Sequence, residues 1–286
     1  MSFSMSSDRA VDLRIESVGE VLDRVERSLE TRLDRDTVVR KRRSVGARTG
    51  RGTWVRIERR ALDKIGGQGW NGTECAAVLE GIAKPAWCAG AAWRDLDEAV
   101  MWRADETGLL PGKPVGTSVL ATDPRLPDTW WQALNSSLDA LASHHTTRIA
   151  TPDTVAITQA GVSEAIRTAF PGNFDTDITH WVPAHADLNW ANVTGDPQFC
   201  LFDWEDWGNA PRGLDAARLW GNSLAVPALA DRVRRERRHD LESRDGRLMT
   251  LLVCAEIISP GTHPEDPRLD PARREAARIL GELEAG

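Results

Sequence analysis

The segment 185–203 constrains the fold of this chain more than any other. It has the pattern His-x-Asp-x-x-x-x-Asn at His185, Asp187 and Asn192. A further carboxylate, Asp203, follows at the end of an apolar run. Phosphoryl transfer needs one carboxylate that orients the acceptor hydroxyl, and an amide and a second carboxylate that hold magnesium ions on the nucleotide phosphates. The spacing is therefore typical of a phosphoryl-transfer site, provided that the chain reverses direction after residue 192.

Two short β-prone runs on either side of a Gly-Asp-Pro cluster at 195–197 supply that reversal, because such clusters form turns. If Thr194 faces Phe199, the hairpin returns Asp203 to the loop that carries the other two side chains. Carboxylate and amide oxygens are hard ligands, and magnesium takes one or two carboxylates while it keeps several waters. The hairpin thus predicts a magnesium site beside Asp187.

These residues resemble the catalytic loop and the metal-binding Asp of the aminoglycoside phosphotransferase and choline kinase-like families, which are small-molecule relatives of the protein kinases. Asp203 is followed by Trp-Glu, whereas protein kinases have Phe-Gly at that point. The segment 210–217 is similar to the family's Asp-Pro-x-x-Asp-Leu-Ala segment, which implies that Asp215 holds the catalytic-loop backbone and does no chemistry. Ala186 stands where the family often has Gly, and Asn189 where it often has His.

The resemblance implies an α+β, bilobal protein kinase-like fold with a small β-rich N-terminal lobe and a larger, mainly helical C-terminal lobe. It also implies transfer of the γ-phosphoryl group of ATP, with Mg²⁺, to a hydroxyl of a small molecule such as a sugar, an aminoglycoside or an amino alcohol. Asp187 would orient and deprotonate the acceptor, and His185 would support the catalytic loop. Asn192 and Asp203 would bind the metal.

Residue periodicity divides the chain into a β-rich first part and a helical second part. We expect one domain at 1–107, with an N-terminal helix and the nucleotide-binding lobe. A second domain at 108–286 would carry the catalytic loop and the acceptor site. The predicted elements are a helix or helix pair within 8–35, a hairpin at 44–58, a short helix at 71–80, strands at 86–93 and 99–105, and helices at 130–142, 154–170, 214–224, around 225–258 and at 271–284.

The nucleotide-binding residues are expected in the first domain. In the family a basic strand residue holds the α- and β-phosphates, and the strand after the Gly-rich turn has no lysine. Arg56 is the best positional match and Arg59 the second, since arginine can bind phosphate with two hydrogen bonds. Glu74 or Glu80 could pair with that arginine, and an ordinary turn and a surface arginine are the alternatives. The residues expected on the nucleotide side are Gly50, Gly52, Arg56, Glu74 and Asp105.

Carboxylates and tryptophans near Asp203 are expected to line the acceptor pocket. Glu205 follows Asp203 by two residues, so on an extended segment both carboxylates would point the same way. The chain has 12 tryptophans and no tyrosine, and such rings could either stack on a sugar or pack the lobe. The residues expected on the acceptor side are Glu205, Asp206, Trp190 and Trp207.

Composition narrows the function classes. A net charge of −7 gives no sign of nucleic-acid binding. No apolar run has the length of a membrane span, and the first residues lack a signal-peptide core, so we expect a cytoplasmic protein. The 4 cysteines are scattered, which argues against a zinc site or a disulfide framework.

Two other functions stay open. A catalytically inactive, nucleotide-binding regulatory protein of the same fold is favoured by the missing strand lysine, although Asp187, Asn192 and Asp203 are all present. A metal-dependent hydrolase could use His185 with Asp187 and Asp203, and with His180 as a further ligand. That reading lacks a second recognisable His-Asp cluster.

Overall fold

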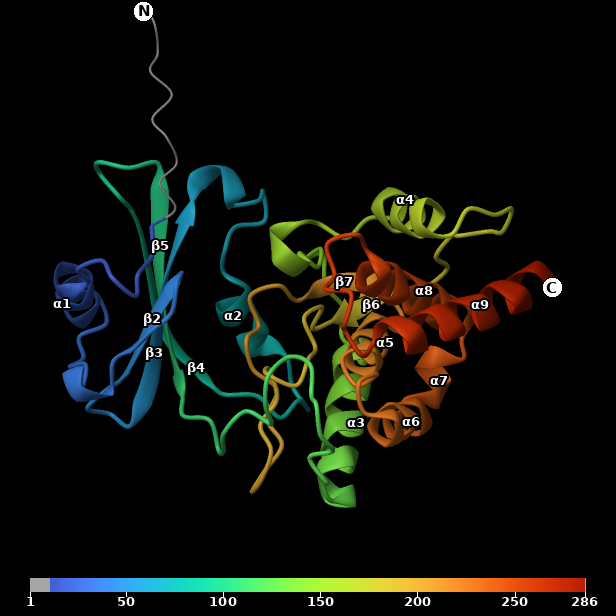
Figure 1. The fold of residues 1–286 in the computed structure, drawn as a ribbon. Coiled ribbons are helices and arrows are strands. Elements are labelled where there is room, and N and C mark those ends of the chain that lie inside the picture. Colours follow the sequence, from blue (N-terminus) through green and yellow to red (C-terminus); the bar gives the residue numbers. More distant parts are fainter. Residues whose placement is uncertain (1–10, 286) are drawn as a thin grey trace, which may run out of the picture. The chain divides into compact units, whose positions relative to one another are not determined.

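The computed structural model describes residues 11–285, which form two compact units (Figure 1). The described part of the first unit comprises residues 11–77 and 85–109, and the second comprises 78–84 and 110–285. All described residues after Leu109 belong to the second unit. The sequence placed the domain boundary at 107. The units are α+β in composition, with a sheet in the first and mainly helices in the second, as the sequence predicts.

The first unit is built on one antiparallel sheet with the strand order β1-β2-β3-β5-β4. In this sheet Arg56 lies opposite Asp105, on neighbouring strands. The predicted hairpin at 44–58 is confirmed as β2 and β3, and the two predicted strands that follow are confirmed as β4 and β5. The strands are β1 (Val39–Arg40), β2 (Ser44–Arg48), β3 (Thr53–Ala61), β4 (Trp87–Arg94) and β5 (Val100–Gly108).

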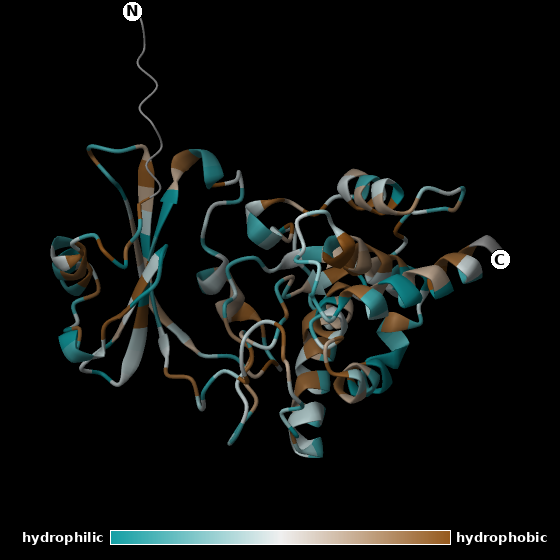
Figure 2. Cartoon of the chain, in the orientation of Figure 1, coloured by the Kyte–Doolittle hydropathy of each residue, from teal (hydrophilic) through white to brown (hydrophobic). Residues whose placement is uncertain are grey.

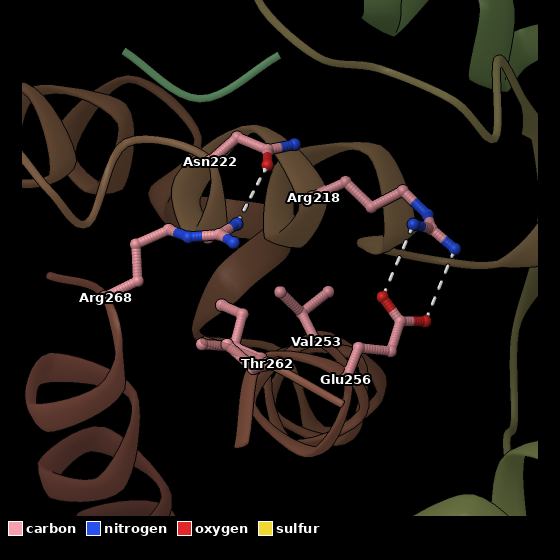
Figure 3. Close-up of a pocket in the computed structure, with 8 residues that line it drawn as sticks. Arg218, Asn222, Val253, Glu256, Thr262 and Arg268 are labelled. Atoms are coloured by element: carbon pink, nitrogen blue, oxygen red, sulfur yellow. Dashed lines mark hydrogen bonds and ion pairs between the residues drawn. The ribbon is translucent and has the colours of Figure 1, made fainter. Parts of the chain in front are cut away.

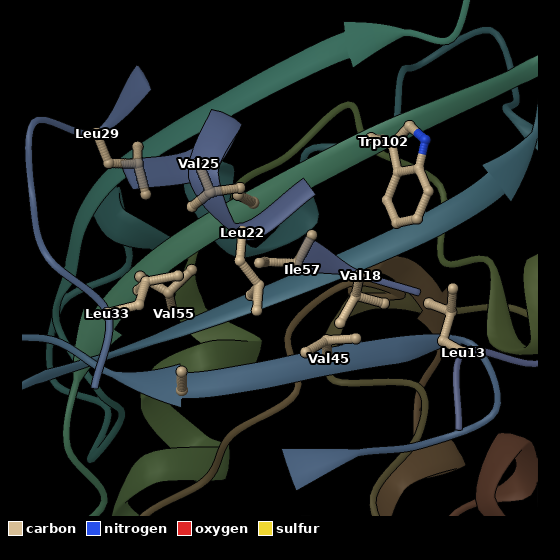
Figure 4. Packing of buried hydrophobic residues seen from close by; sticks show 12 residues of the cluster. Leu13, Val18, Leu22, Val25, Leu29, Leu33, Val45, Val55, Ile57 and Trp102 are labelled. Atoms are coloured by element: carbon tan, nitrogen blue, oxygen red, sulfur yellow. The ribbon is translucent and has the colours of Figure 1, made fainter. Parts of the chain in front are cut away.

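One face of this sheet packs against helix α1 (Gly19–Ser28), as Figure 4 shows. Leu22 and Val25 of α1 pack there against Val55 and Ile57 of β3 in one apolar cluster. Because side chains alternate along a strand, Arg56 projects from the opposite face of the sheet. The core of the first unit therefore lies on one face, and the other face carries Trp54 and Met101 among mainly polar residues.

The helix or helix pair expected within 8–35 is a single short helix, and residues 1–10 lie outside the described part of the chain. The helix ends because Glu30 adopts a left-handed backbone with φ 49°. Leu29 and Leu33 are buried on either side of this turn, and Leu33 bridges to Thr49. The spacing of apolar residues correctly predicts that these side chains are buried, although only part of the expected segment is helical.

The remaining helical elements of the first unit are short. The helix predicted at 71–80 is confirmed in part, as α2 (Gly72–Cys75) followed by a 3-10 turn at Ala76–Val78. Further 3-10 turns lie at Arg35–Thr37 and Leu62–Lys64.

The second unit surrounds helix α8, which is buried over residues 248–254. A helix that is buried all round forms the centre of a core, and Figure 2 shows hydrophobic and hydrophilic bands on the helices of this unit. The helix expected from residue 154 begins only at Gln159, where the Thr158 hydroxyl accepts a hydrogen bond from the Gly161 amide. The helices are α3 (Asp128–Ser143), α4 (Gln159–Ala169), α5 (Leu214–Gly221), α6 (Pro227–Glu236), α7 (Arg238–Leu241), α8 (Arg244–Ile258) and α9 (Leu269–Ala285), with a 3-10 turn at Pro152–Thr154.

A two-stranded antiparallel sheet of β6 (Trp181–Ala184) and β7 (Gly208–Pro211) was not predicted. Pro183 lies in β6 and Pro211 in β7, and proline is rare inside strands because it cannot donate a ladder hydrogen bond. These strands flank segment 185–207 and hold its two ends together. Within residues 11–285, no helix combines the length and the apolar character needed to cross a bilayer.

Candidate active site

The loop after β6 is held from α5 by one buried carboxylate. Asp215, in the first turn of α5, accepts hydrogen bonds from the backbone amides of His185 at 2.7 Å and Ala186 at 2.8 Å. Burial raises the pKa of Asp215, while the neighbouring His185 and these amide bonds act in the opposite direction. The contacts are those of a residue that shapes the loop.

Ala186 adopts a left-handed backbone with φ 70°. This conformation costs roughly 1–2 kcal/mol for a residue other than glycine. The need for a left-handed backbone accounts for the glycine that often stands at this position in the catalytic loop that this segment resembles. In this chain the hydrogen bond from the Ala186 amide to Asp215 stabilises the strained backbone.

Asp187 and Asn192 are joined side chain to side chain. The Asn192 amide donates to the Asp187 backbone oxygen at 2.9 Å and to its Oδ2 at 2.8 Å. The Asn189 amide donates to the same backbone oxygen and to Oδ1, both at 3.0 Å. Because Asn192 uses its amide hydrogens in this way, its Oδ1 is the side-chain atom that can act as a metal ligand.

Asp203 returns to this loop by a hairpin whose register differs by one residue from the prediction. Val193 bridges to Leu201, so Thr194 faces Cys200 rather than Phe199. The turn is therefore one residue longer than expected. The amide of residue 202 bonds to the Asn192 carbonyl at 3.0 Å, which leaves the next residue, Asp203, beside the loop.

The two carboxylates interact electrostatically. Burial raises the pKa of Asp187, and the negative charge of Asp203 raises it further, while His185 and the amides of Asn192 and Asn189 lower it. Asp203 has a left-handed backbone with φ 71°, a strained conformation of a kind that is concentrated at functional sites. A cation bound by Asp203 would offset this repulsion.

His185 links the loop to the residue before Asp203. Its ring is buried, and Nε2 lies 3.0 Å from the Phe202 carbonyl oxygen, so this nitrogen carries the proton. The ring packs edge-on against Trp204, with 4.9 Å between the ring centroids. Within the described residues, Nδ1 is buried and has no hydrogen-bond partner. These contacts suit a structural support.

The tryptophans expected on the acceptor side lie in the core. Trp190 has 0% exposure, stacks on Trp130 with 5.9 Å between centroids, and donates from Nε1 to the Ser223 hydroxyl at 3.0 Å. Trp207 is also buried, and the Arg148 guanidinium lies 5.5 Å from the centre of its ring. Neither ring offers an open face to an acceptor, and both belong to the packed core.

The segment after Asp203 is a turn and not the extended segment expected from the sequence. Strand alternation therefore does not hold Glu205 on the same side as Asp203, and Glu205 lies half-buried in this turn. Asp206 is buried, and its Oδ1 accepts a hydrogen bond from the Thr151 hydroxyl at 3.4 Å. Asp206 thus ties this turn to the segment before α4.

In the first unit, an arginine that sequence reasoning missed occupies the polar face of the sheet. Arg103 of β5 donates to both oxygens of Asp105 at 2.6 Å and to Glu74 of α2 at 3.1 Å, and its side chain is 10% exposed. Glu74 therefore pairs with Arg103, whereas the sequence suggested Arg56. Arg56 lies on the same face and forms an ion pair with Glu58. Arg103 could have been identified from the sequence, because it stands two residues before Asp105 on a predicted strand.

The Gly-rich turn between β2 and β3 is bound to the segment after α1. The Gly50 amide donates to the Arg32 carbonyl at 2.9 Å, and the Arg51 side chain donates to the Leu29 carbonyl at 2.9 Å. Gly52 has φ 76°, which favours glycine at this point. The turn is thus built by local contacts that need no ligand.

Solved structures show which proteins share this architecture. Aminoglycoside phosphotransferase APH(4)-Ia, in a ternary complex with AMP-PNP and hygromycin B, aligns with a TM-score of 0.52 at 13% identity, over 93% of this chain and 97% of its own. A choline/ethanolamine kinase family protein from Mesorhizobium loti gives a TM-score of 0.50 at 15% identity, over 85% and 90%. APH(2")-IIa, in a complex with streptomycin and ATP, gives 0.51 at 11% identity, over 89% and 95%.

No protein-family model matches the sequence, and the curated proteins contain no significant match. At these identities the structural likeness concerns the fold. The chain has the protein kinase-like fold of aminoglycoside phosphotransferases and choline kinases, as the resemblance of segment 185–217 implies.

Proposed function

We propose that this protein is an ATP- and magnesium-dependent phosphotransferase that acts on a hydroxyl of a small molecule. The observation that carries the proposal is the bonded pair of Asp187 and Asn192, to which the hairpin returns Asp203. The fold supports it, because the neighbours that share the fold are small-molecule kinases and phosphotransferases.

The protein's own side chains have distinct tasks in this mechanism. Asp187 accepts a hydrogen bond from the acceptor hydroxyl, orients its oxygen and receives its proton during transfer. Asn192 and Asn189 hold the Asp187 carboxylate in place. Asn192 Oδ1 and the Asp203 carboxylate would hold magnesium, which when bound neutralises phosphate charge. Asp215 and His185 keep the loop in shape.

On the nucleotide side we propose that Arg56 contacts the phosphates and that Arg103 orders the polar face of the sheet. The Arg103 guanidinium already makes bonds to Asp105 and Glu74. Arg56 pairs with Glu58, and its side chain is 38% exposed, so a phosphate can reach it from solvent. Gly50 and Gly52 lie in the turn between β2 and β3, and β3 is the strand that carries Arg56.

Replacing Arg56 by alanine is expected to weaken ATP binding by about 1.5–3 kcal/mol, as for a lost hydrogen bond to a charged group. Arg56→Lys should recover part of the loss, because a point charge still attracts phosphate. Isothermal titration with ATP and magnesium measures the change. Arg59→Ala is the matched control, since Arg59 lies on the same strand but projects from the opposite face.

An unchanged Kd for ATP in Arg56→Ala, together with a raised Kd in Arg103→Lys, would transfer the phosphate contact to Arg103. Arg103→Lys is the appropriate variant because it keeps the charge beside Asp105 and Glu74 while it loses the planar guanidinium. Circular dichroism should accompany it to confirm folding.

On the acceptor side we propose that Glu205 accepts a hydrogen bond from the substrate. Glu205→Gln should then raise the KM for the acceptor by roughly 10-fold or more, the lower end for a hydrogen bond to a charged group. The KM for ATP should stay nearly constant. Glu242→Gln, at an exposed carboxylate of the same unit, serves as the control. A rise confined to ATP or magnesium would instead make Glu205 an auxiliary residue of the metal site.

Two measurements test the function as a whole. ATP with magnesium should raise the melting temperature, and ADP should form when a hydroxyl acceptor is added. Stabilisation by ATP without turnover on any member of a panel of sugars, aminoglycosides, amino alcohols, hydroxy acids and nucleosides would favour the inactive regulatory protein. Absence of both effects would contradict the proposal.

The structure gives no support to the hydrolase reading. His185 is buried and bound to a backbone carbonyl, and His180 pairs at its ring with Asp245 of α8 at 3.1 Å. The two histidines therefore have separate structural contacts.

A further inference from the structure

A cavity of about 210 Å³ lies in the second unit between α5, α8 and the segment before α9. For comparison, a cavity of about 150 Å³ can hold a benzene molecule. Figure 3 shows Arg268 on one side of this cavity and the Arg218–Glu256 pair on the other. The lining residues are Arg218, Gly221, Asn222, Val253, Glu256, Ile257, Thr262 and Arg268.

The polar groups of this cavity are only loosely bonded to one another. Arg218 reaches the two oxygens of Glu256 at 3.4 Å each, and Arg268 reaches the Asn222 side-chain oxygen at 3.4 Å. These distances exceed the 2.7–3.2 Å of ordinary hydrogen bonds. In addition, Arg218 Nε is buried and has no partner among the described residues. The terminal nitrogens of the two arginines can therefore exchange these long contacts for shorter ones to a ligand.

The guanidinium of Arg268 is held in position from outside the cavity. Asp266 accepts from its Nε at 3.0 Å and from its Nη2 at 2.7 Å, which leaves Nη1 directed at Asn222. Among the lining residues, two guanidinium groups face one carboxylate. Each guanidinium already has a carboxylate partner, Glu256 for Arg218 and Asp266 for Arg268. Guanidinium binds carboxylate and phosphate with paired hydrogen bonds, so an anion here would take up the hydrogens that now make only the 3.4 Å contacts.

The floor of the cavity depends on close packing between α5 and α8. A Cβ atom on Gly221 would lie 2.3 Å from Cγ1 of Val253, a distance that no methyl group can occupy. Val253 and Ile257 supply the apolar part of the lining. The cavity therefore has a rigid base formed by two packed helices.

Helix α5 connects this cavity to the catalytic loop. The loop is bonded to Asp215 at the start of the helix and, through Trp190, to Ser223 just past its end. With about 3.6 residues per turn, Asn222 projects within roughly 20° of Asp215, and Arg218 about 60° to one side. Arg218 and Asn222, which line the cavity, thus lie on the part of the α5 surface that adjoins Asp215.

We propose that this cavity binds a carboxylate or phosphate group of the acceptor, so that the substrate is an anionic hydroxyl compound. The inference rests on the proposed phosphotransfer. The acceptor's anionic group binds Arg218 and Arg268, and its hydroxyl is directed to Asp187. In the transfer, the bond between the γ-phosphorus and its bridging oxygen breaks to give ADP. A new bond forms from that phosphorus to the acceptor oxygen, whose proton passes to Asp187.

Charge-matched ligands test the inference without requiring turnover. D-glucose, D-glucosamine, D-glucuronate and glucose 6-phosphate share a ring and differ in charge, and glycerol, glycerate and glycerol phosphate form a second set. Titration calorimetry in the absence of nucleotide should show the anionic members of at least one set binding 10-fold or more tighter than the neutral member. Equal or tighter binding of the neutral or cationic members in both sets overturns the inference.

Two variants tie such binding to the cavity. Arg268→Gln removes one guanidinium, and Asn222→Asp adds a negative charge with almost no change of shape. Each should weaken binding of the anion by 10-fold or more, while Arg273→Gln, at an exposed arginine of α9, should have no effect. Unchanged anion binding in both cavity variants, with folding confirmed by circular dichroism, would contradict the proposal.

The inference and the proposed function can fail separately. ADP formation with neutral or cationic acceptors, but not with anionic ones, would support phosphotransfer and overturn the anionic substrate. Anion binding that depends on Arg268 and Asn222, in a protein that never consumes ATP, would retain the binding site and reject the phosphotransfer.

Discussion

Asp187→Asn is expected to lower the rate of phosphoryl transfer by about 10²- to 10⁴-fold, which is the usual contribution of a positioned general base. The amide can occupy the same space beside Asn192 and Asn189, but it cannot receive the acceptor proton. ATP binding should be retained, because Asp187 touches the acceptor and not the nucleotide in the proposed mechanism. Single-turnover kinetics and titration with ATP measure the two effects separately.

Asp196→Asn is the matched control for this variant, since Asp196 is exposed at the turn of the same hairpin. It should leave both measurements unchanged. If Asp187→Asn lost ATP binding to the same extent as turnover, Asp187 would be a metal ligand and its role as base would be wrong.

The pH dependence of the rate gives a further check on Asp187. Burial raises its pKa, and only the ionised carboxylate can accept a proton. The rate should therefore fall as the pH is lowered through a pKa above about 3.9, the ordinary value for Asp. The corresponding acid limb should be absent from the residual activity of Asp187→Asn.

Asp203→Asn is expected to lower turnover on the order of 10³-fold or more, at the upper end for loss of one transition-state contact. A neutral amide cannot balance the charge of a magnesium ion held at the nucleotide phosphates. Unlike Asp187→Asn, this variant should also weaken the apparent affinity for magnesium. Turnover measured across a magnesium titration reports both changes, and circular dichroism should show an unaltered fold.

Retention of most of the turnover in Asp203→Asn would refute the metal assignment. A useful contrast is Asn192→Ala, which removes the other proposed oxygen ligand and frees the Asp187 carboxylate from one of its amides. If Asn192 binds the metal, its loss should raise the magnesium requirement in the same direction as the loss of Asp203.

The local pattern of the sequence predicted the elements that depend on neighbouring residues. Strands β2, β3, β4 and β5 follow alternation and turn residues, and the hairpin after Asn192 follows its Gly-Asp-Pro turn. Its register was one residue off, because that depends on how many residues the turn takes up. The short β6–β7 pair escaped prediction because its prolines oppose strand formation and only the pairing between distant segments compensates.

The spacing of apolar residues predicted which side chains are buried more accurately than it predicted the backbone conformation. Leu29 and Leu33 continue the apolar spacing of α1, although Glu30 turns the chain between them. Trp190 shows the same limit at the candidate site. It lies between Asp187 and Asn192 in the sequence, so it could have faced a ligand. Its ring instead stacks on Trp130, from a helix sixty residues away in the chain, and lies in the core.

By itself, the sequence determined the spacing of Asp187, Asn192 and Asp203 and the reversal of the chain between them, since both follow from a short segment and its turn. Only the tertiary structure decided that Glu74 pairs with Arg103, and that Arg218 and Arg268 meet at one cavity. Ion pairs and cavities join residues that are far apart in the chain. Their formation depends on strand register and on helix packing, which local sequence patterns do not encode.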